Sequence, residues 1–312
     1  MELRNLLENA IKNDLGDGIL LSGGLDTSII AVITSKYKSL DAFTVAFQNA
    51  PSPDIEYAVL MAKRLKFKHT ILTFDENMLY DALPIVIKVL KSFDPMEIRN
   101  SVVIYLGLNI AKENGVQSVM TGDGSDELFA GYSYLFTFEK EVLNIELEKL
   151  WSTMTFSSIP LAKELRLKAI LPFLEPEFKE FACNVKAEYK IHPENGKIYG
   201  KWILRKAYEG ILPERIIWRD KTPIEVGSGT TILPAFFNQI ISDDEFQQKK
   251  EFYFNEDSTT IRDKEHLFYY EIYRKVVGIP HPNNEHGKVC PYCNSNVPDK
   301  ATFCRICGAY PI

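Results

Sequence analysis

Short apolar runs alternate with longer segments of helical periodicity over the first 120 residues. Leu3, Leu6, Leu7 and Ala10 recur at the spacing of one helix face, which predicts a helix over residues 1–14. Apolar runs bounded by turn residues predict buried strands. The predicted strands are residues 18–21, 41–47, 69–74 and 116–120, and the further predicted helices are residues 29–37, 54–66 and 101–114.

This alternation predicts an α/β fold, a parallel sheet with helices on both faces. Ligands of such sheets bind beyond the carboxyl ends of the strands, where two glycine-bearing turns follow predicted strands. The chain from residue 138 onward is mostly helical in pattern. We therefore expect three parts: a domain over residues 1–278, a polar linker over 279–287 and a small cysteine module over 288–312.

The first turn, SGGLDTS at residues 22–28, lies between a predicted strand and a predicted helix. Its small residues allow a ligand to approach the backbone, and the N–H groups of the following helix favour an anion. Asp26 suits such a turn if Mg²⁺ accompanies a phosphate, because Mg²⁺ binds carboxylates together with phosphate oxygens. The alternative is a structural turn whose hydroxyls only cap the helix.

The second turn, TGDGSDELFAGY at residues 121–132, holds three carboxylates within five residues. Such crowding is unfavourable unless a cation or a donor offsets it. If the two turns are neighbours, Asp26 and Asp126 could hold one Mg²⁺. The alternative is an ordinary helix start, where the dipole favours acidic residues.

Together the two motifs resemble the synthetase half of asparagine synthetases, within the ATP-pyrophosphatase (PP-loop) group, to which the β-lactam synthetases are also similar. The resemblance covers about residues 15–229 and implies the adenine nucleotide α-hydrolase-like fold, with a helical C-terminal half. Further similar segments lie at residues 52–54, 94–101, 169–174 and 201–221.

The resemblance implies ATP and Mg²⁺ as ligands and assigns roles by position. It implies Asp26 and Asp126 as Mg²⁺ ligands, Lys221 as the cation that offsets charge at the α-phosphate, and Asp123 as a group that positions the amine or takes its proton. Arg99 is the candidate for holding a substrate carboxylate. The pyrophosphate would contact Ser22, Gly23, Gly24, Asp26, Thr27 and Ser28, and the adenosine would contact Leu21, Val45 and Gly122.

The implied reaction is that of an AMP-forming carbon–nitrogen ligase. A carboxylate, with the aspartate β-carboxylate as first candidate, attacks the α-phosphorus of ATP and expels pyrophosphate; ammonia or another amine then releases AMP. Lys168 and Ile170 stand where the family usually has Glu and Arg, which leaves the acyl substrate open. The alternatives are an ATP-pyrophosphatase acting on tRNA or another substrate recruited by the cysteine module, and a degenerate synthetase serving as a scaffold.

Glutamine-dependent members of this family begin with a glutaminase domain, whereas about twenty residues precede the first motif here. We therefore expect ammonia to arrive free or from a separate glutaminase or other partner, which the cysteine module could bind.

Four of the five cysteines, Cys290, Cys293, Cys304 and Cys307, form two C-x₂-C pairs separated by ten residues. Four thiolates at this spacing predict a closed, structural Zn²⁺ site and resemble a zinc ribbon. A redox pair or an iron–sulfur site is the alternative. The remaining cysteine, Cys183, is expected to be a buried small apolar residue.

Composition narrows the class of protein. The 312 residues are 46% hydrophobic and carry a net charge of −6, which excludes disorder for most of the chain and disfavours nucleic acid as a partner. We find neither a signal peptide nor an apolar stretch of membrane-spanning length. A cytoplasmic protein that acts on small molecules, without a membrane partner, is the expectation.

Overall fold

The computed structural model describes residues 2–194, 196–284 and 286–312. Met1 of the predicted first helix and Glu285 of the predicted linker lie outside the described residues. The chain divides into two compact units, each treated separately below. The first unit comprises residues 1–45, 53–72 and 107–223, and the second comprises residues 46–52, 73–106 and 224–312. Residues 224–312 thus share one unit, and the domain boundaries expected at 278 and 287 stay a prediction.

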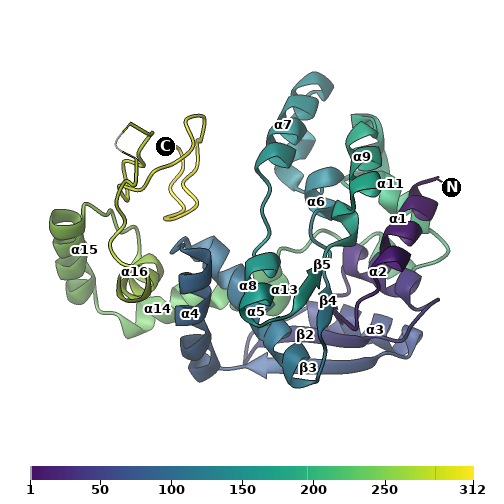
Figure 1. The fold of residues 1–312 in the computed structure, drawn as a ribbon, viewed down its shortest axis with the longest axis horizontal. Coiled ribbons are helices and arrows are strands. Elements are labelled where there is room, and N and C mark those ends of the chain that lie inside the picture. The colour runs from purple at the N-terminus through teal and green to yellow at the C-terminus, as the bar shows by residue number, and fades with distance from the viewer. Residues whose placement is uncertain (1, 195, 285) are drawn as a thin grey trace. The chain divides into compact units, whose positions relative to one another are not determined.

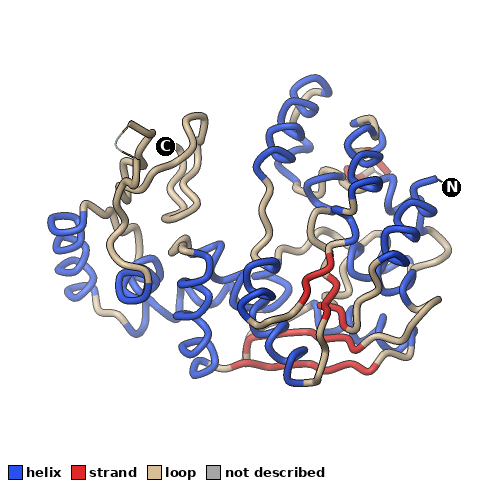
Figure 2. The backbone as a smooth tube through the Cα atoms, in the orientation of Figure 1, coloured by secondary structure: helices blue, strands red, loops and turns tan. Residues whose placement is uncertain are grey.

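A parallel sheet forms the framework of the first unit. Its strand order is β3-β2-β1-β4-β5, and β1 pairs in parallel with β2 and with β4 (Figure 1). Residues 42–47 of β2 are all buried, which requires cover on both faces of the sheet. The predicted fold class is therefore confirmed. The strands, drawn red in Figure 2, are β1 (Gly18–Leu20), β2 (Asp41–Phe47), β3 (Lys68–Phe74), β4 (Ser118–Met120) and β5 (Lys168–Ile170).

The order of the strands reverses between β1 and β4. From β1 the chain passes through α2 to β2 on one side, whereas β4 pairs with β1 on the other side, with Ile19 opposite Met120. Such a switch point is where open α/β sheets bind ligands. The two turns singled out by the sequence follow these two strands, so they begin side by side.

Helix α1 packs against α2 and α9, and the apolar faces of the three helices join the main core cluster of this unit. Helix α8 packs against β5. The first unit also holds a small hairpin of β6 and β7. Its further elements are α1 (Glu2–Asn13), α2 (Leu25–Thr34), α3 (Asp54–Leu65), α6 (Ser125–Leu128), η1 (Ser133–Thr137), α7 (Lys140–Thr153), α8 (Ser158–Glu164), η2 (Pro172–Leu174), α9 (Pro176–Asn184), α10 (Ala187–Lys190), β6 (His192–Glu194), β7 (Lys197–Tyr199), α11 (Trp202–Tyr208) and α12 (Glu214–Ile217).

The second unit is helical and ends in the cysteine module. Helix α16 packs against α4, α14 and α15, and the ring of Phe93 packs between those of Tyr270 and Tyr273. Residues 95–106 of α5 belong to this unit and residues 107–113 to the first. The elements are α4 (Glu76–Leu90), α5 (Pro95–Glu113), α13 (Ile224–Ser228), η3 (Thr230–Ile232), α14 (Leu233–Ile240), α15 (Asp243–Asp257) and α16 (Lys264–Val276).

Several elements differ from the sequence prediction. Helix α2 begins at Leu25 rather than at residue 29, because a first helical turn accepts the polar residues Asp26, Thr27 and Ser28. Helix α5 begins at Pro95 rather than at residue 101, since Asp94 accepts a hydrogen bond from the Met96 N–H and proline suits the first helical position. Helix α4 and strand β5 were not predicted.

Among the described helices, none is both long enough and apolar enough to span a bilayer.

Candidate functional site

The first turn is built for close approach to a ligand. Gly23 has a φ of +67°, and a Cβ there would lie 2.3 Å from the Tyr57 carbonyl carbon, so only glycine fits. The Ser22 hydroxyl accepts a hydrogen bond from the Gly24 N–H at 3.2 Å and lies 3.2 Å from the Thr27 hydroxyl. Gly24 caps α2 without a side-chain bond to the first helical turn in the described chain. Those N–H groups therefore suit an anion.

The second turn lies directly against the first. A Cβ on Gly122 would lie 3.0 Å from the Asp26 Cβ, and the Ser125 hydroxyl donates to Asp26 Oδ1 at 2.7 Å. The structure thus brings Asp26 and Asp126 to one place, as the sequence predicted for neighbouring turns.

A buried lysine bridges the two carboxylates. Lys201 Nζ lies 2.6 Å from Asp26 Oδ2 and 2.8 Å from Asp126 Oδ1, and the lysine side chain is only 4% exposed. Sequence reasoning missed Lys201, because a lysine before an apolar helix segment carries no signal of its own. Its partner Asp26 is 175 residues away in sequence.

Asp126 and Lys201 stabilise each other's charged form. Burial alone would raise the pKa of Asp126, but the ammonium groups of Lys201 and Lys221 outweigh burial and lower that pKa. Burial would lower the pKa of Lys201, but Asp126 and Asp26 outweigh it and raise that pKa. Asp126 and Lys201 are therefore both charged at neutral pH.

Lys221 completes the charged lining. Its Nζ lies 3.8 Å from Asp126 Oδ2 and 5.0 Å from the centre of the Tyr132 ring. The neighbouring Asp220 pairs with Lys197 instead. One cleft is lined by residues of both turns and of the Lys201–Lys221 segment, among them Ser22, Gly24, Asp26, Asp126, Lys201 and Lys221.

Arginines fix the segment that carries Lys221. Arg205, one helical turn after Lys201, donates to the carbonyl oxygens of Gly200, Ile217 and Arg219. Arg219 pairs with Asp54 at 2.6 Å and lies 3.9 Å from the centre of the Tyr57 ring. These contacts hold Lys221 over the cleft.

The other residues assigned to ATP lie around the two turns. Leu21 is 1% and Val45 7% exposed, and a Cβ on Gly107 would lie 3.3 Å from Val45 Cγ2. Ser28 is buried in α2, and its hydroxyl has no hydrogen-bond partner among the described residues. Their contacts with ATP, like those of Gly23, Thr27 and Gly122, stay predictions.

Asp123 is turned toward α8. Its carboxylate accepts hydrogen bonds from the hydroxyls of Ser158 and Thr121, the latter at 2.9 Å. Burial raises the pKa of Asp123, although these two donors oppose the shift. An ionised carboxylate with a raised pKa can accept a proton, so the proposed role is chemically sound and stays a prediction.

Arg99, Lys168 and Ile170, which the sequence connected with the choice of substrate, contact other residues of the chain. Arg99, in the second unit, pairs with the buried Glu265 at 3.4 Å. In the first unit, Lys168 is exposed and pairs with Asp14 at 2.6 Å, and Ile170 is part of the core. The assignment of Arg99 to a substrate carboxylate stays a prediction.

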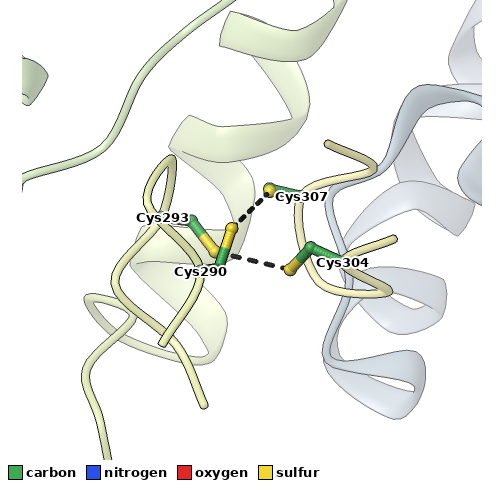
Figure 3. A group of neighbouring side chains, drawn as sticks. All are labelled: Cys290, Cys293, Cys304 and Cys307. Carbon is green, nitrogen blue, oxygen red and sulfur yellow. Dashed lines mark hydrogen bonds between the residues drawn. The ribbon is translucent and has the colours of Figure 1, made fainter. Parts of the chain in front are cut away.

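The four cysteines of the second unit form a tight, buried cluster. Cys290 and Cys293 come from one loop, Cys304 and Cys307 from another, and their sulfurs turn toward one another (Figure 3). The four sulfurs lie within 4.8 Å of one another, with 3.8 Å between Cys290 and Cys307 and 3.7 Å between Cys293 and Cys304. Tetrahedral Zn–S bonds of about 2.3 Å give S–S separations of roughly 3.8 Å, so the cluster fits Zn²⁺.

Comparison with known proteins decides the family. The family pattern described as asparagine synthase matches residues 2–168 and 161–277. This chain belongs to the asparagine synthase family. The facing turns, Asp26, Asp126 and Lys221 all lie inside the matched region, whereas the four cysteines lie after it.

Relatives within the asparagine synthase family are similar over most of this chain. Asparagine synthetase B [glutamine-hydrolyzing] of Escherichia coli (strain K12) is 31% identical over 306 residues, which is 89% of this chain and 54% of the relative. The probable asparagine synthetase [glutamine-hydrolyzing] of Dictyostelium discoideum is 30% identical over 88% of this chain and 53% of the relative. The chain thus spans about half the length of these relatives.

A solved structure of an NMN synthetase from Francisella tularensis is 15% identical, with a TM-score of 0.31 over 59% of this chain and 90% of that chain. A TM-score at that level supports no inference about this chain.

Proposed function

We propose that this chain is an ATP-dependent, AMP-forming ligase that joins a carboxylate to ammonia or another amine. The observation that carries the proposal is the meeting of Asp26 and Asp126 with Lys201 and Lys221, at the uncapped start of α2 and at the switch point of the sheet. Helix N–H groups, paired carboxylates and ammonium groups are what a triphosphate with a divalent cation requires.

The site accepts the cation that the family implies. Asp126 Oδ1 is buried and forms an ion pair with the Lys201 ammonium, 2.8 Å away, so a cation would bind this oxygen in place of that ammonium. Asp26 and Asp126 would hold Mg²⁺, which supplies charge neutralisation at the phosphates.

The chain's own residues position ATP and offset its charge. The N–H groups of the first turn and α2 bind the β- and γ-phosphates, and Gly23 lets them approach. The substrate carboxylate attacks the α-phosphorus, and one oxygen of the carboxylate becomes the bridge to AMP while pyrophosphate leaves. Lys221 stabilises the negative charge that gathers on the α-phosphate.

The second step forms the amide. The amine attacks the activated carbonyl carbon, and AMP leaves with the bridging oxygen. Asp123, held by Ser158 and Thr121, takes a proton from the attacking amine. Aspartate is the first acyl candidate by family. The exposed Lys168 and the core residue Ile170 support testing other acids beside it.

We also propose that the cysteine cluster binds a structural Zn²⁺, since four ligands leave no open position for chemistry. A zinc-thiolate site requires reduced cysteines, which supports a reducing, cytoplasmic location.

Product analysis tests the proposal. The purified, zinc-loaded protein receives Mg-ATP and ammonium with aspartate, and then with other carboxylates or tRNA in its place. We expect AMP and pyrophosphate in equal amounts, formed only when an acyl substrate is present, and lost in Asp126→Asn. ADP as the nucleotide product would overturn the proposal. AMP formed with tRNA and with no small acid would favour the nucleic-acid alternative.

A further inference from the structure

Each carboxylate oxygen of Asp26 and Asp126 lies near a donor that belongs to the chain itself. Asp26 Oδ1 accepts from Ser125, and Asp26 Oδ2 faces Lys201 at 2.6 Å. Asp126 Oδ1 faces Lys201 at 2.8 Å, and Asp126 Oδ2 faces Lys221 at 3.8 Å. A divalent cation between these carboxylates would need the oxygens that the Lys201 ammonium already contacts.

The backbone is shaped to keep Lys201 in this position. Lys201 is left-handed, with a φ of +55°, and its N–H donates to the Phe129 carbonyl at 2.9 Å. A Cβ on Gly131 would lie 2.4 Å from Lys201 Cε and 1.8 Å from Asp126 Oδ1. A Cβ on Gly200 would lie 2.1 Å from the Ala130 carbonyl oxygen. Two glycines thus make room for the lysine between the turns.

We propose that Lys201 is a positioning residue that holds the place of the divalent cation between Asp26 and Asp126, so that the cation binds only together with the nucleotide. The inference rests on the Mg-ATP site of the proposed function. Lys201 would thereby fix the order in which the site fills.

Electrostatics give the reason. A cation that arrives alone must displace a buried ammonium whose ion pairs within the described residues are with these same two carboxylates, and a buried charge that loses its partners is strongly unfavourable. A nucleotide brings phosphate oxygens that can accept the displaced ammonium. After this exchange the divalent cation is paired with the two carboxylates, and the Lys201 ammonium is paired with the phosphate oxygens.

The experiment compares Mn²⁺ binding with and without nucleotide. Mn²⁺, titrated by electron paramagnetic resonance, stands for Mg²⁺, and an ATP analogue with a methylene group between the α- and β-phosphates prevents turnover. For the wild-type protein we expect Mn²⁺ alone to bind at least tenfold more weakly than Mn²⁺ with the analogue. For Lys201→Met we expect Mn²⁺ alone to bind at least tenfold more tightly than in the wild type.

Controls separate this inference from the proposed function. Adding Asp126→Asn to Lys201→Met should abolish the gain in Mn²⁺ affinity, and Lys206→Met, an exposed lysine of α11, should leave affinity unchanged. Wild-type protein that binds Mn²⁺ equally well with and without the analogue overturns the inference and needs no variant. Equal Mn²⁺ affinity of folded Lys201→Met and wild type overturns it as well. Failure to bind the nucleotide with Mn²⁺ counts instead against the proposed function.

Discussion

Charge balance among single residues shapes the cleft that Asp26, Asp126, Lys201 and Lys221 line. Two half-buried carboxylates face two lysines of different exposure, since the Lys201 side chain is 4% exposed and that of Lys221 is 31% exposed. Lys201 is buried and pairs with two carboxylates, so it maintains the structure of the site. Lys221 is partly exposed and lies 3.8 Å from Asp126, so it remains available to a ligand. Substitutions at the two positions should therefore differ in their effects.

Lys221→Met should lower kcat about 10²–10³-fold, because the charge developing on the α-phosphate loses its stabilising cation. The free energy of unfolding should change by less than about 1 kcal/mol, since the lost ion pair is partly exposed. Steady-state kinetics and urea denaturation measure both quantities, with Lys206→Met as the matched control. A variant that keeps the wild-type kcat would remove Lys221 from the mechanism.

Lys190 provides a residue-scale prediction away from the cleft. It is 1% exposed, and its Nζ lies 4.4 Å from the centre of the Trp151 ring, with no carboxylate partner among the described residues. Burial lowers the pKa of Lys190 to about 8. The folded protein therefore bears the cost of a buried charge at pH 7, and this cost fades as pH rises from about 8 toward the ordinary value of 10.5.

Lys190→Met should raise the free energy of unfolding by about 1–3 kcal/mol at pH 7, and by less at pH 10. Denaturation at the two pH values measures the difference. A Met variant that is less stable than wild type at pH 7 would show that the contact with Trp151 outweighs the burial cost.

The sequence predicted the acidic residues of the site but not their lysine partner. Asp26 and Asp126 each follow a strand within a distinctive turn, so their meeting follows from parallel topology. The position of Lys201 depends on a left-handed backbone and on two glycines in separate segments, which no local pattern reports.

At the scale of elements, the site depends on how tightly the loop before α2 meets α3. Gly23→Ala should destabilise the fold by about 2–4 kcal/mol and abolish nucleotide binding, because its Cβ would clash with the Tyr57 backbone. Gly115→Ala is the matched control. Gly115 also has a positive φ, of +81°, but a Cβ there would meet open space, so its cost should be only about 1 kcal/mol. Equal losses in both variants would contradict the close-approach argument.

The cysteine module docks on its own unit through backbone carbonyls. The Phe93 N–H donates to the Ile306 carbonyl at 2.7 Å, and the Thr260 N–H donates to the Tyr292 carbonyl at 2.7 Å. Arg262 donates to the carbonyls of Gly308 at 2.6 Å and Cys307 at 2.8 Å. The second C-x₂-C loop is therefore held by the loop before α16 and by the turn before α5.

Arg262→Ala should release this loop. We expect the free energy of unfolding to fall by about 1–3 kcal/mol, as for two hydrogen bonds from a charged donor. We also expect faster hydrogen exchange at residues 304–308 and faster loss of the metal to a chelator. The exposed Lys300, changed to Ala, is the control on the same module. Unchanged exchange in Arg262→Ala would show that the docking contacts do not order the loop.

Element boundaries were predictable where the chain carries a capping signal. The Asp-Pro step at residues 94–95 marks the start of α5, whereas the apolar periodicity alone predicts a start at residue 101. Strand β5 has only three residues, and its pairing with β4 stabilises it more than its own composition does. The cysteine cluster was predictable because ligand spacing alone specifies a tetrahedral site.

At the scale of the whole molecule, the family and the geometry lead to one central claim. The chain belongs to the asparagine synthase family, spans about half the length of its curated relatives, and places Asp26, Asp126 and their lysine partners at the switch point of its sheet. The claim is that this site transfers AMP to a carboxylate and then replaces AMP with an amine.

The measurement that tests the claim most directly follows one oxygen atom. An acid that supports turnover, with aspartate tried first, is labelled with ¹⁸O in its carboxylate and incubated with Mg-ATP, ammonium and the protein. Attack on the α-phosphorus transfers one labelled oxygen to AMP, so mass spectrometry of the nucleotide should show AMP heavier by about 2 Da. Label found in inorganic phosphate, with ADP as the nucleotide, would contradict the account.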